Sequence, residues 1–374
     1  MFFRDVIGHY SEKAGLIRQF RDGMLPHAMM FAGPAGNGKL PLAIALAAYI
    51  HCENRTEEDA CGSCSSCIKM SKFSHPDLHF SFPVISKKSA KDSNVSSYWL
   101  SDWRKALSED PYMYYQDWMA RIADEGKQGN ISRNEAAQII QKLSLRTYES
   151  KYKVMIIWMA EYLKEEGNHL LKLLEEPPEG TFLILIADRP SEVIGTILSR
   201  CQMVRVGMIE SDAITEALVR NFEIREGDAA SIANLAEGDY RAAQMLVGDE
   251  KLDLTKEFLE WMRLCYKIDP SPLVSWIEKL AQKGREAQKN FLQGAAFLLR
   301  EALHFQYNPS HMSRLTQGEV DALMKFSKFL KFHQLAKLQQ QMEQDSYYIV
   351  RNGNPRLIFM TGSLKAHRVL MDRQ

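Results

Sequence analysis

The strongest constraint on the fold is a glycine-rich segment that directly follows a short apolar run near the N-terminus. The spacing is Gly-x-x-x-x-Gly-Lys, which is typical of a loop whose backbone N–H groups surround a phosphate while the lysine adds positive charge. An apolar helix expected over 42–49 favours this interpretation over a chance glycine-rich turn. The segment consists of Gly33, Pro34, Ala35, Gly36, Asn37, Gly38, Lys39 and Leu40.

One part of this motif is missing. The residue after the lysine is normally serine or threonine, whose hydroxyl holds Mg²⁺, and here it is Leu40. The segment therefore indicates descent from nucleotide-hydrolysing proteins and predicts that this chain does not hydrolyse nucleotide itself.

Residues 1–205 alternate between helical and strand-like patterns. The strand-like runs are continuously apolar rather than alternating, so we expect a parallel sheet covered by helices on both faces. The predicted strands are 29–32, 154–157 and 182–187, and the predicted helices are 11–20, 40–51, 134–143 and 168–174.

Beyond residue 206 the strand signals stop. We therefore expect an α/β domain over 1–206, a small helical domain over 207–249 and a larger helical domain over 250–374. The predicted helices are 211–221, 228–236 and 240–247 in the small domain, and 254–266, 272–282, 287–306, 318–332, 333–343 and 356–370 in the larger one.

The segment 83–129 interrupts the α/β pattern and is rich in aromatic residues. Such density predicts a packed insertion rather than an unstructured loop. Its aromatic residues either pack within the insertion or form a surface for a partner, and both interpretations stay open. They are Tyr98, Trp99, Trp103, Tyr112, Tyr114, Tyr115 and Trp118.

Four of the six cysteines are clustered as Cys52, Cys61, Cys64 and Cys67. Four thiolates at this spacing can form a tetrahedral shell around Zn²⁺ that leaves no position for water, so the predicted site is structural. An iron–sulfur cluster is the alternative. His51, His75 and His79 are near enough in sequence to substitute for a ligand, and Cys265 is expected in a core.

Composition adds two constraints. The formal net charge is zero, yet residues 251–374 carry 19 Lys and Arg against 12 Asp and Glu, a net charge of +7. A basic C-terminal third fits contact with DNA or an acidic partner, or simply a solvated helical surface. No signal peptide and no apolar stretch long enough for a membrane span are visible, so we expect a cytoplasmic protein.

Taken together, the motifs resemble the clamp loader of bacterial DNA polymerase III, of the AAA+ class. The resemblance spans nearly the whole chain except 83–129. It implies a RecA-like AAA+ domain, a helical lid and an all-α collar that holds subunits together. The segments that carry it are Val6–Gly8, the phosphate loop, Leu25–Ala28, the cysteine knuckle (52–67), His75–Asp77, Leu170–Pro178, Thr196–Cys201 and Asn354–Leu357.

Departures from the family pattern predict a subunit that cannot hydrolyse ATP itself. In an active loader ATPase the strand after Lys153 ends in Asp-Glu, whereas here Trp158 and Met159 follow it. Glu161 lies too far along to replace them unless the chain bends. Because phosphoryl transfer depends on Mg²⁺ and charge placement, we expect no hydrolysis in cis. Binding of ATP or ADP by Lys39 and the glycines stays open.

The resemblance also implies a role for Arg200, the arginine of the Ser-Arg-Cys motif. In the family this residue reaches into the nucleotide site of the neighbouring subunit as an arginine finger. An intramolecular salt bridge is the alternative interpretation.

A subunit with an intact finger and no motor would be a stator. Its implied partners are the gamma/tau-like ATPase and delta-like subunits, the sliding clamp and primer–template DNA. The rivals are an active motor subunit and a zinc-containing DNA-binding module. The latter is disfavoured because residues 61–67 contain no Lys or Arg.

Overall fold

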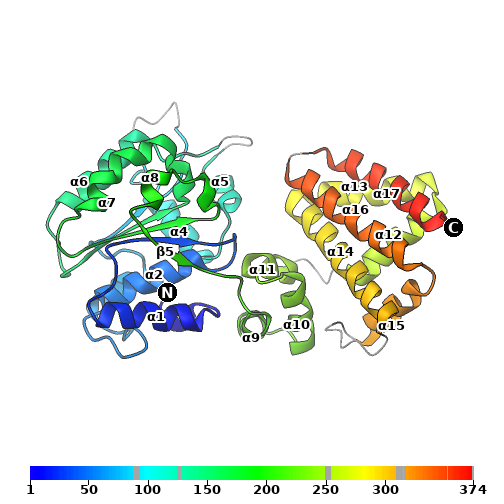
Figure 1. Cartoon of the computed structure of the whole chain (residues 1–374), viewed down its shortest axis with the longest axis horizontal. Helices are drawn as coiled ribbons and strands as arrows, with labels where there is room; N and C mark the ends of the chain where they lie inside the picture. The colour runs from blue at the N-terminus through cyan, green and yellow to red at the C-terminus, as the bar shows by residue number, and fades with distance from the viewer. Residues whose placement is uncertain are drawn as a thin grey trace. The chain divides into compact units, whose positions relative to one another are not determined.

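The computed structural model describes residues 1–86, 93–123, 128–248, 254–308, 315, 317–351 and 353–372. The chain divides into two compact units, one formed by 1–217 with 237–241 and the other by 218–236 with 242–374 (Figure 1). The division into an α/β domain, a lid and a collar therefore stays a proposal.

A parallel five-stranded sheet forms the centre of the first unit, as the sequence predicted. Its order is β2-β3-β4-β1-β5, and each neighbouring pair is parallel. The two edge strands were not predicted because both are short and β5 is largely exposed. The strands are β1 (Ala28–Ala32), β2 (Leu78–Ser81), β3 (Lys153–Trp158), β4 (Thr181–Ala187) and β5 (Gln202–Arg205).

Helices cover both faces of this sheet (Figure 1). Met29 and Phe31 of β1 pack with α1, α2 and α4 on one face, whereas Met30 packs with α6 and α7 on the other. The helices are α1 (Tyr10–Arg21), α2 (Lys39–His51), α3 (Ser65–Ser71), α4 (Leu100–Glu109), α5 (Tyr115–Ile122), α6 (Arg133–Ser144), α7 (Leu171–Glu175) and α8 (Gly195–Leu198), with 3-10 turns at Phe3–Asp5, Ala160–Leu170 and Pro190–Glu192.

The described residues of the aromatic insertion form α4 and α5 and pack into the first unit. The Trp103 ring stacks on Phe82, with centroids 4.1 Å apart, and Trp118 lies edge-on to both rings. Both tryptophans are fully buried. The prediction of a packed insertion is therefore confirmed for these residues.

The second unit is helical. The first helix, α9 (Ser211–Phe222), begins in the first unit, and the Trp261 and Trp276 rings stack 5.3 Å apart in the core of the second. Cys265 is buried there as predicted, and Leu298 is buried in the same core. The other helices are α10 (Glu226–Leu235), α11 (Tyr240–Gly248), α12 (Leu254–Lys267), α13 (Pro270–Gln282), α14 (Arg285–Tyr307), α15 (Gln317–Ser327), α16 (Phe332–Val350) and α17 (Pro355–Met371).

One helix boundary was wrong. The helix predicted over 318–332 ends at Ser327, and α16 begins at Phe332 and continues to Val350. A short linker, 328–331, separates the two helices, and it becomes part of a surface groove considered below. Within the described residues, none of the helices combines the length and apolar character that crossing a membrane requires.

Candidate functional site

The predicted phosphate loop joins β1 to α2, as the motif requires. α2 begins at Lys39, and Gly36 and Gly38 both have positive φ, of 68° and 89°. A side chain at either position would be strained, which is the physical reason for glycine there. The loop thus has the backbone of a phosphate-binding loop.

The lysine of this loop is already paired with a carboxylate of the chain itself. The Lys39 Nζ lies 2.9 Å from the Asp188 carboxylate and 2.9 Å from the side-chain oxygen of Asn37. Burial lowers the pKa of Lys39, and the negative charge of Asp188 opposes that shift. The charge that would attract a phosphate is therefore neutralised within the protein.

A second carboxylate and two tyrosines cover the loop. The Asp239 carboxylate lies so close to Gly36 that an added Cβ there would be 1.8 Å from its oxygen. The Tyr114 hydroxyl donates to Asp239 at 2.7 Å, and the Tyr112 ring lies against Gly38, where a Cβ would be 3.0 Å away.

The remaining cavity at the loop is about 20 Å³, which holds roughly one water. Ligand sites usually offer roughly 300–1,000 Å³. In this arrangement a nucleotide phosphate would have to displace the Asp239 and Tyr112 side chains.

The positions that would hold Mg²⁺ are also apolar and packed. Leu40 is 4% exposed and belongs to the hydrophobic core. Trp158 ends β3 with its ring 5.1 Å from Trp103, and Met159 after it is buried. None of these side chains offers an oxygen ligand.

Glu161 could replace the missing acidic residues after β3 only if the chain bends. The structure has this bend. Met159 adopts a left-handed conformation with φ 58°, and Glu161 follows with one carboxylate oxygen 3.2 Å from the Asp188 backbone nitrogen and 3.3 Å from that of Arg189. Burial raises the pKa of Glu161 to about 7. A carboxyl group that is substantially protonated at neutral pH is a poor Mg²⁺ ligand.

Arg200 lies just beyond α8 and forms the salt bridge that the sequence argument held as the alternative. Its Nε donates to the Glu175 carboxylate at 2.7 Å, and its Nη1 donates to the Thr196 carbonyl at 3.0 Å. The arginine side chain is 32% exposed and Glu175 is 50% exposed. The guanidinium is thus oriented but remains at the surface.

The four cysteines of the knuckle come together. All four sulfurs lie within 4.8 Å of one another, and Cys61 and Cys67 are 3.8 Å apart. Zn–S bonds of about 2.3 Å in a tetrahedron place sulfurs about 3.8 Å apart. The donor set and its spacing therefore fit a single Zn²⁺-sized ion.

Local backbone geometry prepares these sulfurs for a cation. Cys52 follows α2 directly, and Cys64 caps α3. Backbone N–H groups of Cys61 and Cys64 donate to the sulfurs of Cys52 and Cys61 at 3.2 and 3.3 Å. Backbone N–H groups, chiefly those of Ser63 and Cys64, lower the pKa of Cys61 to about 6, whereas burial raises the pKa of Cys52 and of Cys67.

The nearby histidines do not join the sulfur cluster. Among the residues that the structure describes, the group of candidate ligands contains cysteines alone. The His51 and His75 rings stack 4.3 Å apart instead, and His75 Nε2 lies 3.3 Å from the Ser66 hydroxyl.

Comparison of the sequence with known proteins identifies the family of this chain. The sequence profile described as "DNA polymerase III, delta subunit" matches residues 9–210, more than half of the chain. The chain belongs to the DNA polymerase III delta subunit family. The predicted resemblance to clamp-loader proteins is thereby confirmed.

Two curated relatives of this family member extend the match. The DNA polymerase III subunit delta' of Yersinia pestis is 24% identical over 333 residues, which cover 87% of this chain and 84% of the relative. The subunit tau of Bacillus subtilis is 22% identical and covers 97% of this chain, which spans 61% of tau. Among solved structures, the crystal structure of a DNA polymerase III gamma subunit-related protein of Thermotoga maritima matches with a TM-score of 0.41 at 16% identity. The match covers 95% of this chain and 99% of that one.

Sequence reasoning missed four residues at the loop of this family member: Tyr112, Tyr114, Asp188 and Asp239. Each reaches the loop across a large sequence separation, as Tyr114 and Asp239 do across 125 residues. Two of them come from the aromatic insertion, whose density was the one available signal. The insertion thus contributes to closing the phosphate loop.

We predict that the purified full chain holds one zinc ion and that Cys64→Ser lowers its zinc affinity by about 100-fold or more, because one of four thiolate ligands is lost. Zinc content by mass spectrometry and a chelator competition would measure this. Cys201→Ser, a cysteine outside the cluster, should keep the ion. Equal zinc affinities of the two variants in the chelator competition would contradict the assignment.

We also predict a pH effect from Glu161. Because its folded pKa is raised, its contribution to stability is complete below about pH 4.5 and is lost as the pH rises through about 7. Glu161→Gln should remove this loss and gain about 2–3 kcal/mol relative to the native chain between those pH values. Urea unfolding across this range would measure it. The exposed Glu165→Gln is the control, and parallel Glu161→Gln and native curves would refute the prediction.

Proposed function

We propose that the chain is a delta-prime subunit of a bacterial DNA polymerase III clamp loader and acts as a stator that neither binds nor hydrolyses nucleotide. The observation that carries this proposal is the closed phosphate loop. Lys39 is paired with Asp188, and about 20 Å³ remains for a ligand.

Electrostatics and metal chemistry support the proposal together. Two carboxylates, Asp188 and Asp239, lie at the loop where a phosphate would bring further negative charge. Leu40 and Trp158 replace the residues that would hold Mg²⁺, and phosphoryl transfer relies on that ion for charge stabilisation. ATP and ADP are therefore not cofactors of this subunit in our account.

In this proposal Arg200 is the chain's contribution to catalysis, as an arginine finger for the nucleotide of a neighbouring subunit. A planar guanidinium can bind a transferring phosphoryl group through two hydrogen bonds. Glu175 and the Thr196 carbonyl hold it at the surface before the neighbour arrives. Arg200 would exchange the exposed Glu175 for phosphate oxygens, which costs little because surface ion pairs are weak.

The remaining assignments follow from the same role. The cysteine knuckle would hold a structural Zn²⁺, since four protein ligands leave no site for substrate. Residues 207–249 would be a lid and 250–374 a collar that assembles with gamma/tau-like ATPase and delta-like subunits. The assembly would act on a sliding clamp and primer–template DNA, and we propose no membrane partner.

An active gamma/tau-like motor subunit is the second candidate, because the tau relative covers 97% of this chain. A motor needs an open phosphate loop and two metal ligands. The side chains at positions 40, 158 and 159 disfavour this alternative.

We predict that Arg200→Ala slows ATP hydrolysis at the neighbouring site by about 10³-fold. The measurement is single-turnover hydrolysis in a reconstituted loader whose other ATPase sites are inactivated. Arg200→Lys should be nearly as slow, because a point charge lacks the planar fork.

The matched control is Arg225→Ala, which removes another surface arginine paired with an acidic residue, Asp228. It should leave the rate unchanged. A native rate for Arg200→Ala in a complex that still assembles would overturn the finger assignment.

A further inference from the structure

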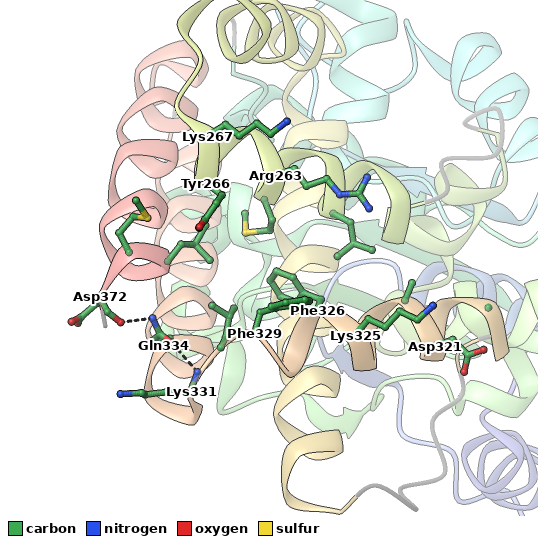
Figure 2. Close-up of a pocket in the computed structure, with 17 residues that line it drawn as sticks. Arg263, Tyr266, Lys267, Asp321, Lys325, Phe326, Phe329, Lys331, Gln334 and Asp372 are labelled. Atoms are coloured by element: carbon green, nitrogen blue, oxygen red, sulfur yellow. Dashed lines mark hydrogen bonds between the residues drawn. The ribbon is translucent and has the colours of Figure 1, made fainter. Parts of the chain in front are cut away.

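A large groove opens on the second unit. It lies between α12, α15, the linker residues 329–331, Gln334 of α16 and the end of α17 (Figure 2). Its volume is about 1070 Å³, at the upper end of the usual size of ligand pockets. A space of this size fits side chains from a segment of another protein.

The floor of the groove is apolar. Met262 and Leu330 are 2% and 8% exposed and belong to the core of this unit, and Leu259, Phe326 and Leu370 also line the groove. The floor is thus rigid, because it is the outer surface of a packed core.

Two large side chains at the mouth are exposed. Phe329 is 85% exposed and Tyr266 is 52% exposed, and Figure 2 shows Phe329 beside Phe326 of the floor. Exposed aromatic side chains next to an apolar groove are typical of protein-binding surfaces, where such residues supply much of the binding energy.

The rim of the groove is positively charged. Arg263, Lys267, Lys325 and Lys331 line it, and none of the four makes an ion pair within the part of the chain that the structure describes. Of the two acidic residues that line it, Asp372 lies 3.7 Å from Lys337, and the other is Asp321. Cations therefore outnumber carboxylates around an apolar floor.

We propose that this groove binds an amphipathic helix of a partner protein whose flanks are acidic. A helix presents apolar residues at i, i+3, i+4 and i+7 on one face, which match an apolar floor, and carboxylates beside that face would meet the four cations. Single-stranded nucleic acid is disfavoured, because it binds by stacking bases on aromatic platforms and this floor is largely aliphatic. The inference does not depend on the clamp-loader role.

The test uses the full chain and a fluorescent helical peptide of about 16 residues, long enough to form a helix. The probe carries Leu at i, i+3, i+4 and i+7 and Glu on the flanks. A matched peptide carries Lys in place of each Glu. We expect the acidic peptide to bind at least about tenfold more tightly in fluorescence anisotropy, with a difference that shrinks as salt rises.

Two variants locate the binding site, and each has a matched control. Phe329→Ser and Lys267→Glu should each weaken binding of the acidic peptide by about tenfold or more. Phe332→Ser and Lys279→Glu change exposed residues of the same types that do not line the groove. They should leave the affinity within about twofold of the native value, since neither residue meets the probe.

Other results would overturn the proposal. Equal binding of the two peptides, no binding of either, or equal effects of the groove and control variants would show that no acidic helix is recognised. Binding of labelled oligothymidylate that is lost in Phe329→Ser would identify a nucleic-acid site. Loss of assembly with loader subunits in that variant would identify a contact between subunits.

Discussion

The closed state of the phosphate loop in the first unit depends on the ion pair between Lys39 and Asp188. The two residues follow neighbouring parallel strands, because Ala32 at the end of β1 pairs with Ala187 at the end of β4. Parallel strands end at the same edge of a sheet, so a cation and an anion arrive together at the phosphate loop. Lys39 is 3% exposed and Asp188 is 21% exposed, so loss of Asp188 would leave a buried lysine without its charged partner, at a cost of up to about 3–5 kcal/mol.

Helix α2 connects this closed loop to the cysteine knuckle. It begins at Lys39, ends at His51 directly before Cys52, and every one of its residues is buried. In the stator role proposed above, this buried helix would hold the loop and the knuckle in a fixed relation. The N-terminal segment is tied to the same region, since Asp59 accepts hydrogen bonds from the Phe3 and Arg4 backbone.

The sequence was most informative where structure is local. Continuous apolar runs predicted the three central strands, and close cysteine spacing predicted the sulfur cluster. Edge strands β2 and β5 were missed because short, partly polar segments carry little signal. Asp239 and Tyr114 could not be predicted, because their contacts join distant parts of the chain. The groove, likewise, is formed by helices far apart in sequence.

Nucleotide binding by the full chain alone tests the central claim most directly. Equilibrium titration with Mg·ATP and with ADP should give no saturable binding up to about 1 mM, because the loop is closed and its lysine is paired. A gamma/tau-like motor subunit is the positive control. Micromolar binding by the chain, lost in Lys39→Ala, would contradict the account and show that the loop opens for nucleotide.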